Sequence, residues 1–350
     1  MGAYIFRRLL YSFAIFFGVV VLVFLLFNAM PGDAARLTMG QRSDLKSIEN
    51  ARKEMNLDKP IFKRFLLFLN DLSPIGMYND EQVESRKGTQ VLIQNQDRNL
   101  VLKWPYLGRS YRTKTEVTTV LGQALPGTLI LAFSAMLFAT VFGILLGVLA
   151  ALKKDTWLDT SAIAASVAGI SLPSFFSGLI VAYLFGFLLS QYTGLSMTGS
   201  LFTYDPFKGK QLSLQNLILP SLALGIRPLA IITQLTRSAL LDVLNQDYIL
   251  TALAKGLGYT KAVFKHALPN ALNPVVTAVS GWLAELMVGS FFVEFIFGWK
   301  GIGKVTVDAL DKFDFPIVMG SVLLTATIFI IVNLLTDLLY TRLDPRVKLQ

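Results

Sequence analysis

Long apolar runs, separated by polar segments, dominate the order of residues along this chain. Four stretches, at 9–32, 117–152, 160–204 and 315–336, contain no charged residue. An α-helix rises about 1.5 Å per residue, so roughly 20 apolar residues cross the hydrocarbon core of a bilayer, which is about 30 Å thick. The apolar runs therefore predict six membrane-spanning helices, at about 9–29, 122–150, 159–190, 214–235, 272–295 and 316–340.

The first run is longer than the apolar core of a cleaved signal peptide. It follows Arg7 and Arg8 and extends over 21 residues, from Leu9 to Ala29. A signal peptide has a core of about 7–15 residues and a small-residue cleavage site. Because this run is longer and leads into Met-Pro-Gly, we expect a retained membrane helix.

The distribution of lysine and arginine predicts the orientation in the membrane. Six spans place both termini on one side, and the short segments on that side hold eleven basic residues against five on the other. Short cytoplasmic segments carry the excess of basic residues, so both termini are expected in the cytoplasm. The eleven are Arg7, Arg8, Lys153, Lys154, Arg237, Lys255, Lys261, Lys265, Arg342, Arg346 and Lys348; the five are Lys208, Lys210, Lys300, Lys304 and Lys312.

The polar segment after the first helix, at 31–118, is expected outside the cell, because long loops cross the membrane regardless of charge. Residues 43–57 have a helix-forming composition, residues 59–72 have the spacing of an amphipathic helix, and residues 89–104 read as strand, turn and strand. One interpretation is a cap packed on the outer face. The other is a docking surface or gate for an extracellular partner, and the two are compatible.

These patterns predict an all-α integral membrane protein with a small α/β extracytoplasmic insertion after the first helix. The expected parts are the N-terminal tail and first transmembrane helix at 1–30, the extracytoplasmic cap at 31–118, and a five-helix core at 119–350 that contains a cytoplasmic loop at 238–269.

Composition supports the membrane prediction and excludes several kinds of site. The chain is 53% hydrophobic and 16% charged, with a mean hydropathy of +0.56, whereas soluble domains are about 25% charged. The net charge of +9 does not come from a basic patch, so we expect no nucleic-acid partner. The absence of cysteine excludes disulfides and thiol chemistry, and the single histidine, His266, excludes a multi-histidine metal site. No nucleophile stands beside a base, so no catalytic residues are predicted.

One segment nearly matches a nucleotide-binding loop. Residues 298–305 (GWKGIGKV) fit the spacing G-x4-G-K, but Val305 stands where that loop needs a hydroxyl to hold magnesium. The segment also follows a predicted membrane helix rather than a strand. We therefore interpret it as a glycine-rich turn and expect no ATP hydrolysis by this chain.

Four ionisable residues fall within the predicted spans, where each is costly unless it has a partner or faces water. Glu294 and Asp337 lie close enough to the ends of their spans to be interfacial, which is the favoured interpretation. Arg227 and Glu285 lie deeper. They either pair with one another, pair with a second subunit or face an aqueous path, and a structural pair is favoured.

The predicted cytoplasmic loop is longer than two neighbouring helices require. Residues 238–253 are expected to form a helix, Gly256 and Gly258 to break it, and Tyr259–Leu268 to form a second, basic helix that Pro269 stops. A bent helix pair with a cationic and apolar surface suits docking into a groove of a cytoplasmic protein. A solvated connector is the alternative.

This loop resembles the "EAA" coupling loop of ABC importer permeases. Ala252, Gly256, Leu268 and Pro269 reproduce its spacing, A-x3-G-x11-L-P, and DYILTALAKGLGYTKAVFKHALPNALNPVV resembles the version in dipeptide and oligopeptide permeases. The resemblance covers nearly the whole chain, through YIFRRLL, MPGDAAR, LDKPIFKRFLLFL, ALPGTLILA, ISLPSFFSGL, LILPSLALG, VEFIFGWKGIGK and VNLLTDLLYTRLDPRV. The chain is thus similar to B-type permease subunits of peptide and nickel importers. Leu250 stands where other importer families have an acidic residue, which the peptide subfamily often lacks as well. Residues 73–105 are longer than the usual connection in the family.

The resemblance implies the type I ABC importer permease fold in the inner membrane of a bacterium. It further implies a homologous second permease, two cytoplasmic ATPases that bind ATP and magnesium, and an extracytoplasmic solute-binding protein, with surrounding membrane lipid and no cofactor on this chain. The residues expected to transmit force from the ATPases are Ala252, Gly256, Leu257, Gly258, Tyr259, Lys261, Lys265, His266, Leu268 and Pro269.

The expected solute is a di- or oligopeptide, with nickel complexes, oligosaccharides or another small solute as alternatives within the family. A self-contained secondary transporter is a more distant alternative. It predicts inverted repeats and paired interrupted helices with polar residues at mid-depth, and the sequence shows no such repeat.

Overall fold

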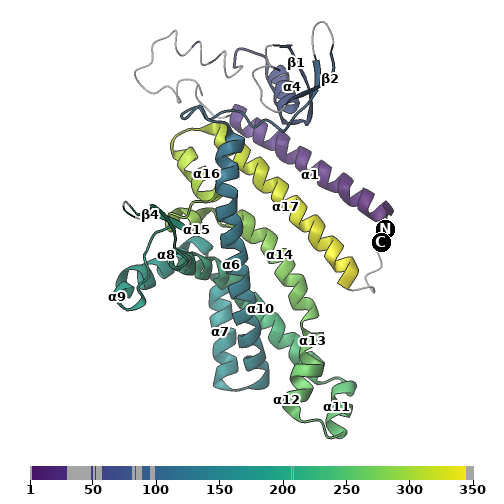
Figure 1. The fold of residues 1–350 in the computed structure, drawn as a ribbon. Helices are drawn as coiled ribbons and strands as arrows, with labels where there is room; N and C mark the ends of the chain where they lie inside the picture. The colour runs from purple at the N-terminus through teal and green to yellow at the C-terminus, as the bar shows by residue number, and fades with distance from the viewer. Residues whose placement is uncertain are drawn as a thin grey trace. The chain divides into compact units, whose positions relative to one another are not determined.

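The computed structural model describes residues 2–29, 49, 52, 57–80, 83, 89–94, 99–205, 207 and 209–343 (Figure 1). The described residues divide into two compact units. One unit holds residues 1–12, 124–304 and 325–350, and the other holds residues 13–123 and 305–324.

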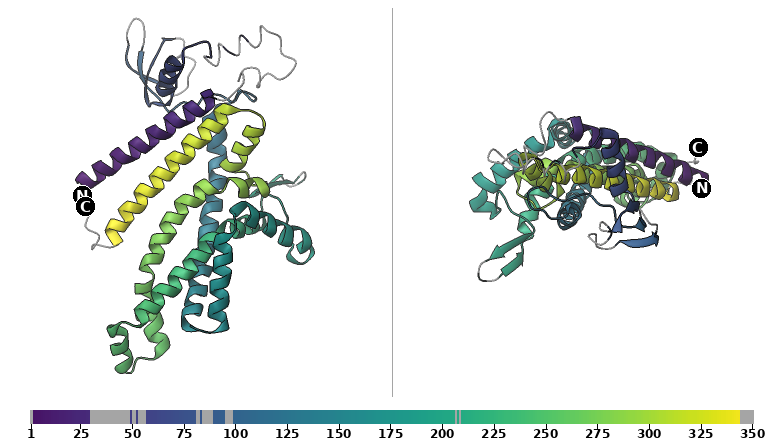
Figure 2. Two further views of the ribbon diagram at one scale, coloured as in Figure 1. Left: turned by 180° about the vertical axis from the view of Figure 1, so that it is seen from behind. Right: turned by 90° about the horizontal axis from the view of Figure 1, so that it is seen from above.

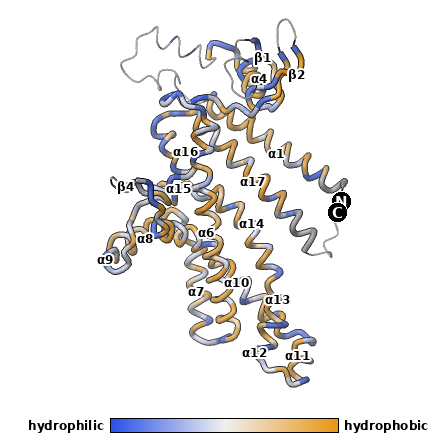
Figure 3. Tube along the Cα trace, in the orientation of Figure 1, coloured by the Kyte–Doolittle hydropathy of each residue, from blue (hydrophilic) through white to orange (hydrophobic). Residues whose placement is uncertain are grey.

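Within the described part of the chain, four helices are long and apolar enough to cross a membrane: α1 (Gly2–Ala29), α6 (Val117–Leu152), α10 (Gln215–Leu244) and α17 (Phe315–Leu343). Two bent helix pairs meet the same test, so the described residues hold up to six spans if each pair counts as one. Apolar residues predominate along α6 and α17 in Figure 3. By length and composition, these elements match the six predicted runs.

The third predicted run forms two helices rather than one continuous span. Helices α7 (Trp157–Ser171) and α8 (Ser174–Tyr183) meet at 111°, and the π-helix η1 (Leu184–Leu188) continues α8. The bend lies at Leu172 and Pro173. Leu172 has an extended backbone (φ −77°, ψ 129°), because a residue that precedes proline is disfavoured in the helical region.

Helix α10 is the centre of the first unit, with α6, α7, α8 and α14 (Asn273–Gly289) packed around it. Small residues on α6 allow close approach to α10: a Cβ atom at Gly147 would lie 2.6 Å from the Cβ of Thr236. Such small-residue contacts are typical of membrane helices, whose association depends on close packing. The buried core includes Leu131, Ala135, Leu224, Ile232, Val293, Phe297 and Trp299.

Three short elements follow α8 in this unit. They are α9 (Ser190–Thr193) and a hairpin of β4 (Phe202–Asp205) and β5 (Gly209–Leu212), paired antiparallel. The hairpin is not among the predicted elements, because both strands are only four residues long and β5 (GKQL) lacks an apolar alternation. Lys210 lies over the Phe202 ring, 4.0 Å from its centroid.

The second unit contains the predicted amphipathic helix and strand pair. Helix α4 (Ile61–Leu72) precedes a three-stranded antiparallel sheet of β1 (Ile75–Tyr78), β2 (Gln90–Ile93) and β3 (Asn99–Leu102), in the order β1-β3-β2. The strand–turn–strand prediction for 89–104 is confirmed, and β1 adds a third strand. Most of the helix predicted at 43–57 lies outside the described residues.

Aromatic and polar contacts hold α4 to its surroundings in this unit. Phe24 of α1 packs on Phe65 and Phe68, with ring centroids 5.0 and 5.7 Å apart. The buried Lys103 ammonium donates to the Ser73 carbonyl oxygen at 2.9 Å and to that of Asp71. The ammonium group therefore binds carbonyl oxygens at the C-terminal end of α4, just before the sheet begins.

A turn before α6 is attached to the turn before α17, also within the second unit. The buried Asp314 carboxylate accepts hydrogen bonds from the Ser110 hydroxyl and, at 2.9 Å, from the Tyr111 backbone N–H. Burial, together with the Asp314 charge, raises the pKa of the Tyr111 phenol to about 12, and Arg64 opposes the change. Tyr111 is therefore a neutral, packed side chain at physiological pH.

Candidate functional site

The segment that resembles a coupling loop forms a short helical hairpin at residues 247–271, here named the α11–α13 hairpin. It consists of α11 (Asp247–Ala254), α12 (Tyr259–Ala262), the π-helix η2 (Val263–Ala267) and α13 (Leu268–Ala271). Figure 2 shows it beyond the ends of α10 and α14. The helix predicted at 238–253 is interrupted, because α10 ends at Leu244 and α11 begins after Gln246.

Gly256 forms the turn of the hairpin. Its φ angle is +86°, in the left-handed region that glycine adopts without a steric penalty. A Cβ atom there would meet nothing within 4 Å, so the backbone conformation rather than crowding requires glycine. The prediction of a break at this position is confirmed. Gly258 has ordinary angles (φ −60°, ψ 140°) and precedes α12.

Pro269 does not stop the helix, contrary to the sequence prediction. It lies in the first turn of α13, directly after η2, and the chain continues helically to α14. A proline inside a regular helix removes one hydrogen bond and clashes with the preceding turn. The wider π-helical turn, in which bonds span five residues rather than four, gives it room. The chain bends by 47° between α13 and α14.

An apolar cluster attaches the hairpin to the long helices. Ile249 of α11, Ala267 of η2 and Ala271 of α13 are buried with Leu240 of α10 and with Val148 and Ala151 of α6. Asn270 also donates a hydrogen bond of 3.1 Å to the Tyr248 hydroxyl. The hairpin is therefore packed against both α6 and α10.

The outer face of the hairpin combines aromatic and basic side chains. Tyr259 and Phe264 are 54% and 53% exposed, and Lys261 and Lys265 are exposed beside them. The other expected contact residues differ in exposure. Those that are exposed are Gly256, Gly258 and Pro269, and those that are half-buried are Ala252, Leu257, His266 and Leu268. Phe264 is not among the contact residues that the sequence analysis expected. Ala262, Val263 and Ala267 are buried, which leaves Phe264 on the opposite, exposed face of the same turn. This pattern of burial identifies Phe264 as part of the outer face.

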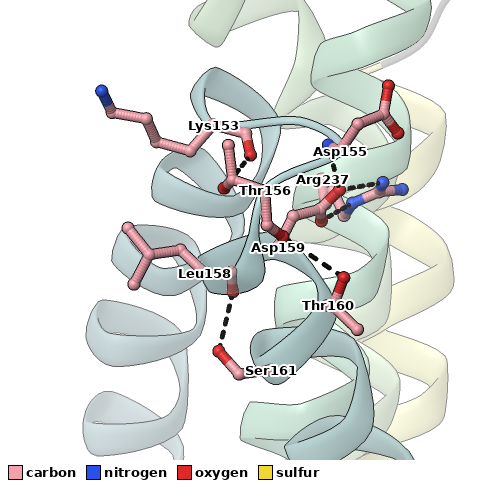
Figure 4. A network of polar contacts seen from close by, with 8 residues as sticks. All are labelled: Lys153, Asp155, Thr156, Leu158, Asp159, Thr160, Ser161 and Arg237. Atoms are coloured by element: carbon pink, nitrogen blue, oxygen red, sulfur yellow. Dashed lines mark hydrogen bonds and ion pairs between the residues drawn. The ribbon is translucent and has the colours of Figure 1, made fainter.

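A buried ion pair lies where α6 turns into α7 (Figure 4). Arg237 of α10 donates from Nη2 to Asp159 Oδ2 at 2.7 Å, and its Nε donates to Oδ1 of the same carboxylate. The Asp155 backbone N–H also donates to Asp159 Oδ2, at 3.0 Å. The side chains of Lys153 and Asp155 point away from the pair. Sequence reasoning counted Arg237 only among the basic residues and did not anticipate its partner.

Arg227 and Glu285 lie close together, as one of the predicted arrangements requires. Arg227 Nη1 of α10 is 3.8 Å from Glu285 Oε1 of α14, and the guanidinium lies 5.6 Å from the centroid of the Trp282 ring. The two side chains are 48% and 54% exposed in this chain. They are therefore paired with one another but not buried.

Glu294 is buried within the protein and has polar partners that the sequence did not reveal. It lies in α15 (Phe291–Ile296) with 0% exposure. Its Oε1 accepts hydrogen bonds from the hydroxyls of Thr128 and Ser290, and its Oε2 accepts them from the backbone N–H groups of Gly303 and Lys304. Four donors compensate for the burial of this carboxylate, which the sequence pattern alone does not reveal.

The segment that nearly matches a nucleotide-binding loop, residues 298–305, contributes the two N–H groups that bind Glu294. Helix α16 (Ile302–Asp311) begins at the glycine-rich turn, and its first N–H groups point at the Glu294 carboxylate. The N-terminus of a helix attracts anions. Here the chain's own carboxylate occupies the position that a phosphate takes in a nucleotide-binding loop, which supports the interpretation as a structural turn.

Asp337, the fourth candidate, forms an ion pair with Arg8 near the ends of α17 and α1, with side chains 22% and 43% exposed. Among the described residues, no group of three or more histidine, cysteine, aspartate or glutamate side chains has the arrangement of a metal site.

The structural comparison supports the fold. A chain of the inward-facing MetNI methionine ABC transporter matches with a TM-score of 0.50, at 18% identity, over 65% of this chain and 97% of that chain. At this identity the likeness concerns the fold alone.

Two curated relatives match over their full length. The di/tripeptide transport system permease protein of Pseudomonas aeruginosa is 36% identical over all of both chains. The glutathione transport system permease protein of Escherichia coli is 32% identical over 99% of this chain and 98% of its own length. The family model for the inner membrane component of binding-protein-dependent transport systems matches residues 143–349, and the model for the N-terminal part of such membrane components matches residues 1–132. The chain therefore belongs to the family of binding-protein-dependent transport system inner membrane components, the permeases of ABC importers.

Proposed function

We propose that this chain forms half of the translocation path of an ATP-driven importer for di- or oligopeptides, in the inner membrane of a bacterium and with both termini in the cytoplasm. The observation that carries the solute class is the full-length match, at 36% identity, to a di/tripeptide permease. The match to a glutathione permease points to the same chemistry, because glutathione is itself a modified tripeptide. A second, homologous permease completes the path.

The α11–α13 hairpin is the proposed contact with the ATPases. Its exposed Tyr259, Phe264, Lys261 and Lys265 form an aromatic and basic face that suits a groove with apolar and acidic walls. Two cytoplasmic ATPase subunits bind ATP and magnesium, and this chain contributes no catalytic residue. An extracytoplasmic solute-binding protein delivers the peptide.

The packing of the hairpin supports a mechanical role. Its buried residues contact the ends of α6 and α10, and α13 leads directly into α14. When the ATPases close, a shift of the hairpin moves these three helices, because a closely packed cluster transmits displacement rather than absorbing it. Helices α6, α10 and α14 then alternate between outward- and inward-facing arrangements.

The test is co-expression with the neighbouring genes, purification and reconstitution into proteoliposomes with ATP inside and the binding protein outside. We expect ATP-dependent uptake of a labelled dipeptide and cross-linking of a cysteine at position 264 to an ATPase subunit. Uptake of a nickel complex or an oligosaccharide in place of the peptide would reject the solute class. Uptake of any solute without ATPase subunits would reject the importer class.

A further inference from the structure

Helix α10 carries two arginines in ion pairs, and the two pairs differ in construction. Arg237 makes two short contacts to the buried Asp159. Arg227 makes a single contact of 3.8 Å to Glu285, which is longer than a hydrogen bond, and both partners are about half exposed. The Asp159–Arg237 pair joins α7 to α10 through hydrogen bonds to both carboxylate oxygens. The Glu285 pair leaves most donors and acceptors of both groups available to another molecule.

The surface around Glu285 is suited to water rather than to lipid. Asn273, Thr277, Gly281 and Glu285 are all exposed and recur every four residues along α14, so they form a continuous stripe that turns gradually around the helix. A polar and small-residue face on a membrane-spanning helix, with an accessible charge, indicates contact with water or with another polar surface. Arg227 adjoins this face from α10, over the Trp282 ring.

We propose that Arg227 and Glu285 bind the two charged ends of a short peptide as it passes through the path. Arg227 binds the C-terminal carboxylate, for which the guanidinium offers a matching pair of donors, and Glu285 binds the N-terminal ammonium group. This inference rests on the proposed function and specifies the solute chemistry that the path recognises.

The ion pair serves the empty state. Without solute, Arg227 and Glu285 neutralise one another, so neither charge stands alone within the span. A zwitterionic peptide exchanges this one ion pair for two, and the net charge of the site remains zero at each stage. Because the contact is long and both side chains are exposed, breaking this ion pair costs less free energy than breaking the Asp159–Arg237 pair.

The pairing of opposite charges selects among solutes. A cationic metal complex would engage Glu285 and leave Arg227 without a partner, and a neutral oligosaccharide would require no charge of either sign. Only a solute with both an anionic and a cationic group matches the site.

Trp282 provides a direct probe, because its emission reports the position of the guanidinium above it. The purified permease–ATPase complex, without the binding protein, is titrated with alanyl-alanine, with its N-acetyl derivative and with its C-terminal amide. The same titration of the Trp282→Phe variant isolates the signal of Trp282. We expect the free dipeptide to change this emission, with roughly tenfold higher concentrations needed for each capped peptide, as the loss of one charged contact predicts.

The variants assign each end. Because Arg227→Gln removes the guanidinium that Trp282 reports, binding of the three peptides to both variants is measured by titration calorimetry of the same complex. Arg227→Gln should abolish the preference for a free carboxylate alone, and Glu285→Gln the preference for a free amino group alone. Equal responses to all three peptides, or preferences that persist in both variants, would overturn the proposal. The double variant Arg227→Gln/Glu285→Gln leaves no charge unpaired, and should co-purify with its partners as the unmodified chain does. Loss of assembly in the double variant would instead show a structural or subunit contact and would also overturn the proposal.

Uptake by the complete reconstituted transporter separates this inference from the proposed function. Dipeptide uptake that both single variants leave unchanged would reject the peptide site while the importer function stands. Failure of the unmodified transporter to import any peptide would reject the proposed function itself.

Discussion

The Thr128 hydroxyl of α6 donates a hydrogen bond of 2.7 Å to Oε1 of Glu294 in α15, and both side chains are buried. The same Thr128 oxygen accepts a hydrogen bond from the Ile302 backbone N–H at 2.8 Å, at the start of α16. Three helices therefore meet at one pair of side chains. Hydrogen bonds within the chain therefore hold the glycine-rich turn between α15 and α16.

Replacement of Glu294 tests the junction. Glu294→Ala leaves the N–H groups of Gly303 and Lys304 without their acceptor, and each buried group without a partner costs about 1–3 kcal/mol. We expect a clearly lower melting temperature in detergent. Glu294→Gln keeps one carbonyl oxygen, which can accept hydrogen bonds from the two N–H groups. Its NH2 group can donate hydrogen bonds to the oxygens of the two hydroxyls. This variant should therefore lose less than half as much, and equal losses in the two variants would contradict the assignment.

Replacement of Asp159 and Arg237 tests whether their ion pair stabilises the junction of α7 and α10. Asp159→Asn should destabilise the protein by about 1–3 kcal/mol, because it removes the counter-charge and a charge-assisted hydrogen bond of the partly buried Arg237 guanidinium. The double variant Asp159→Leu/Arg237→Met removes both charges and should recover most of the loss. Thermal unfolding of the three proteins in one detergent measures this. A double variant that is less stable than the single one would show that the ion pair itself contributes the stability.

Two neighbouring residues of η2 separate docking from folding. Phe264 is 53% exposed, so Phe264→Ala should leave the melting temperature unchanged while weakening co-purification of the ATPase at least severalfold. Val263 is fully buried, so Val263→Ala should destabilise the protein by about 2 kcal/mol and leave the docking face intact. The reverse pattern would place the docking face elsewhere on the hairpin.

Gly256 provides a test of the turn. A leucine there would be strained at φ +86°, although its side chain has space. We expect Gly256→Leu to insert into the membrane and to assemble, but to lose peptide-stimulated ATPase activity and uptake. Gly258→Ala is the matched control, because the angles at Gly258 suit any residue. Normal uptake by Gly256→Leu would show that the turn is not required for coupling.

Tyr111 predicts a pH dependence of stability. Its pKa is raised to about 12 by burial and by Asp314, so the folded state keeps the proton that the unfolded chain releases near pH 10. The contribution to stability is complete below pH 10 and is lost as the pH rises toward 12. Between pH 9 and 11 the melting temperature of the unmodified protein should therefore fall more steeply than that of Tyr111→Phe. Parallel slopes would show that the phenol does not titrate differently in the two states.

Local patterns were sufficient for much of the fold. The lengths of the apolar runs predicted the spans, the spacing at 59–72 predicted α4, and the alternation at 89–104 predicted β2 and β3. The break at Gly256 was also predicted, because a glycine in a left-handed turn is a property of one residue. The bend between α7 and α8 was missed, although Pro173 signalled it, because the apolar run continues through it.

The sequence by itself determined which residues lie in membrane-spanning segments, where the α11–α13 hairpin turns, and that Arg227, Glu285, Glu294 and Asp337 needed an explanation. Only the tertiary structure decided the partner of each charge: Glu285 for Arg227, Asp159 for Arg237, and the hydroxyls and N–H groups of distant segments for Glu294. The physical reason is that hydropathy and periodicity are properties of neighbouring residues. A buried or paired charge is stabilised by groups that only helix packing brings together, from as far apart in the chain as Thr128 and Glu294.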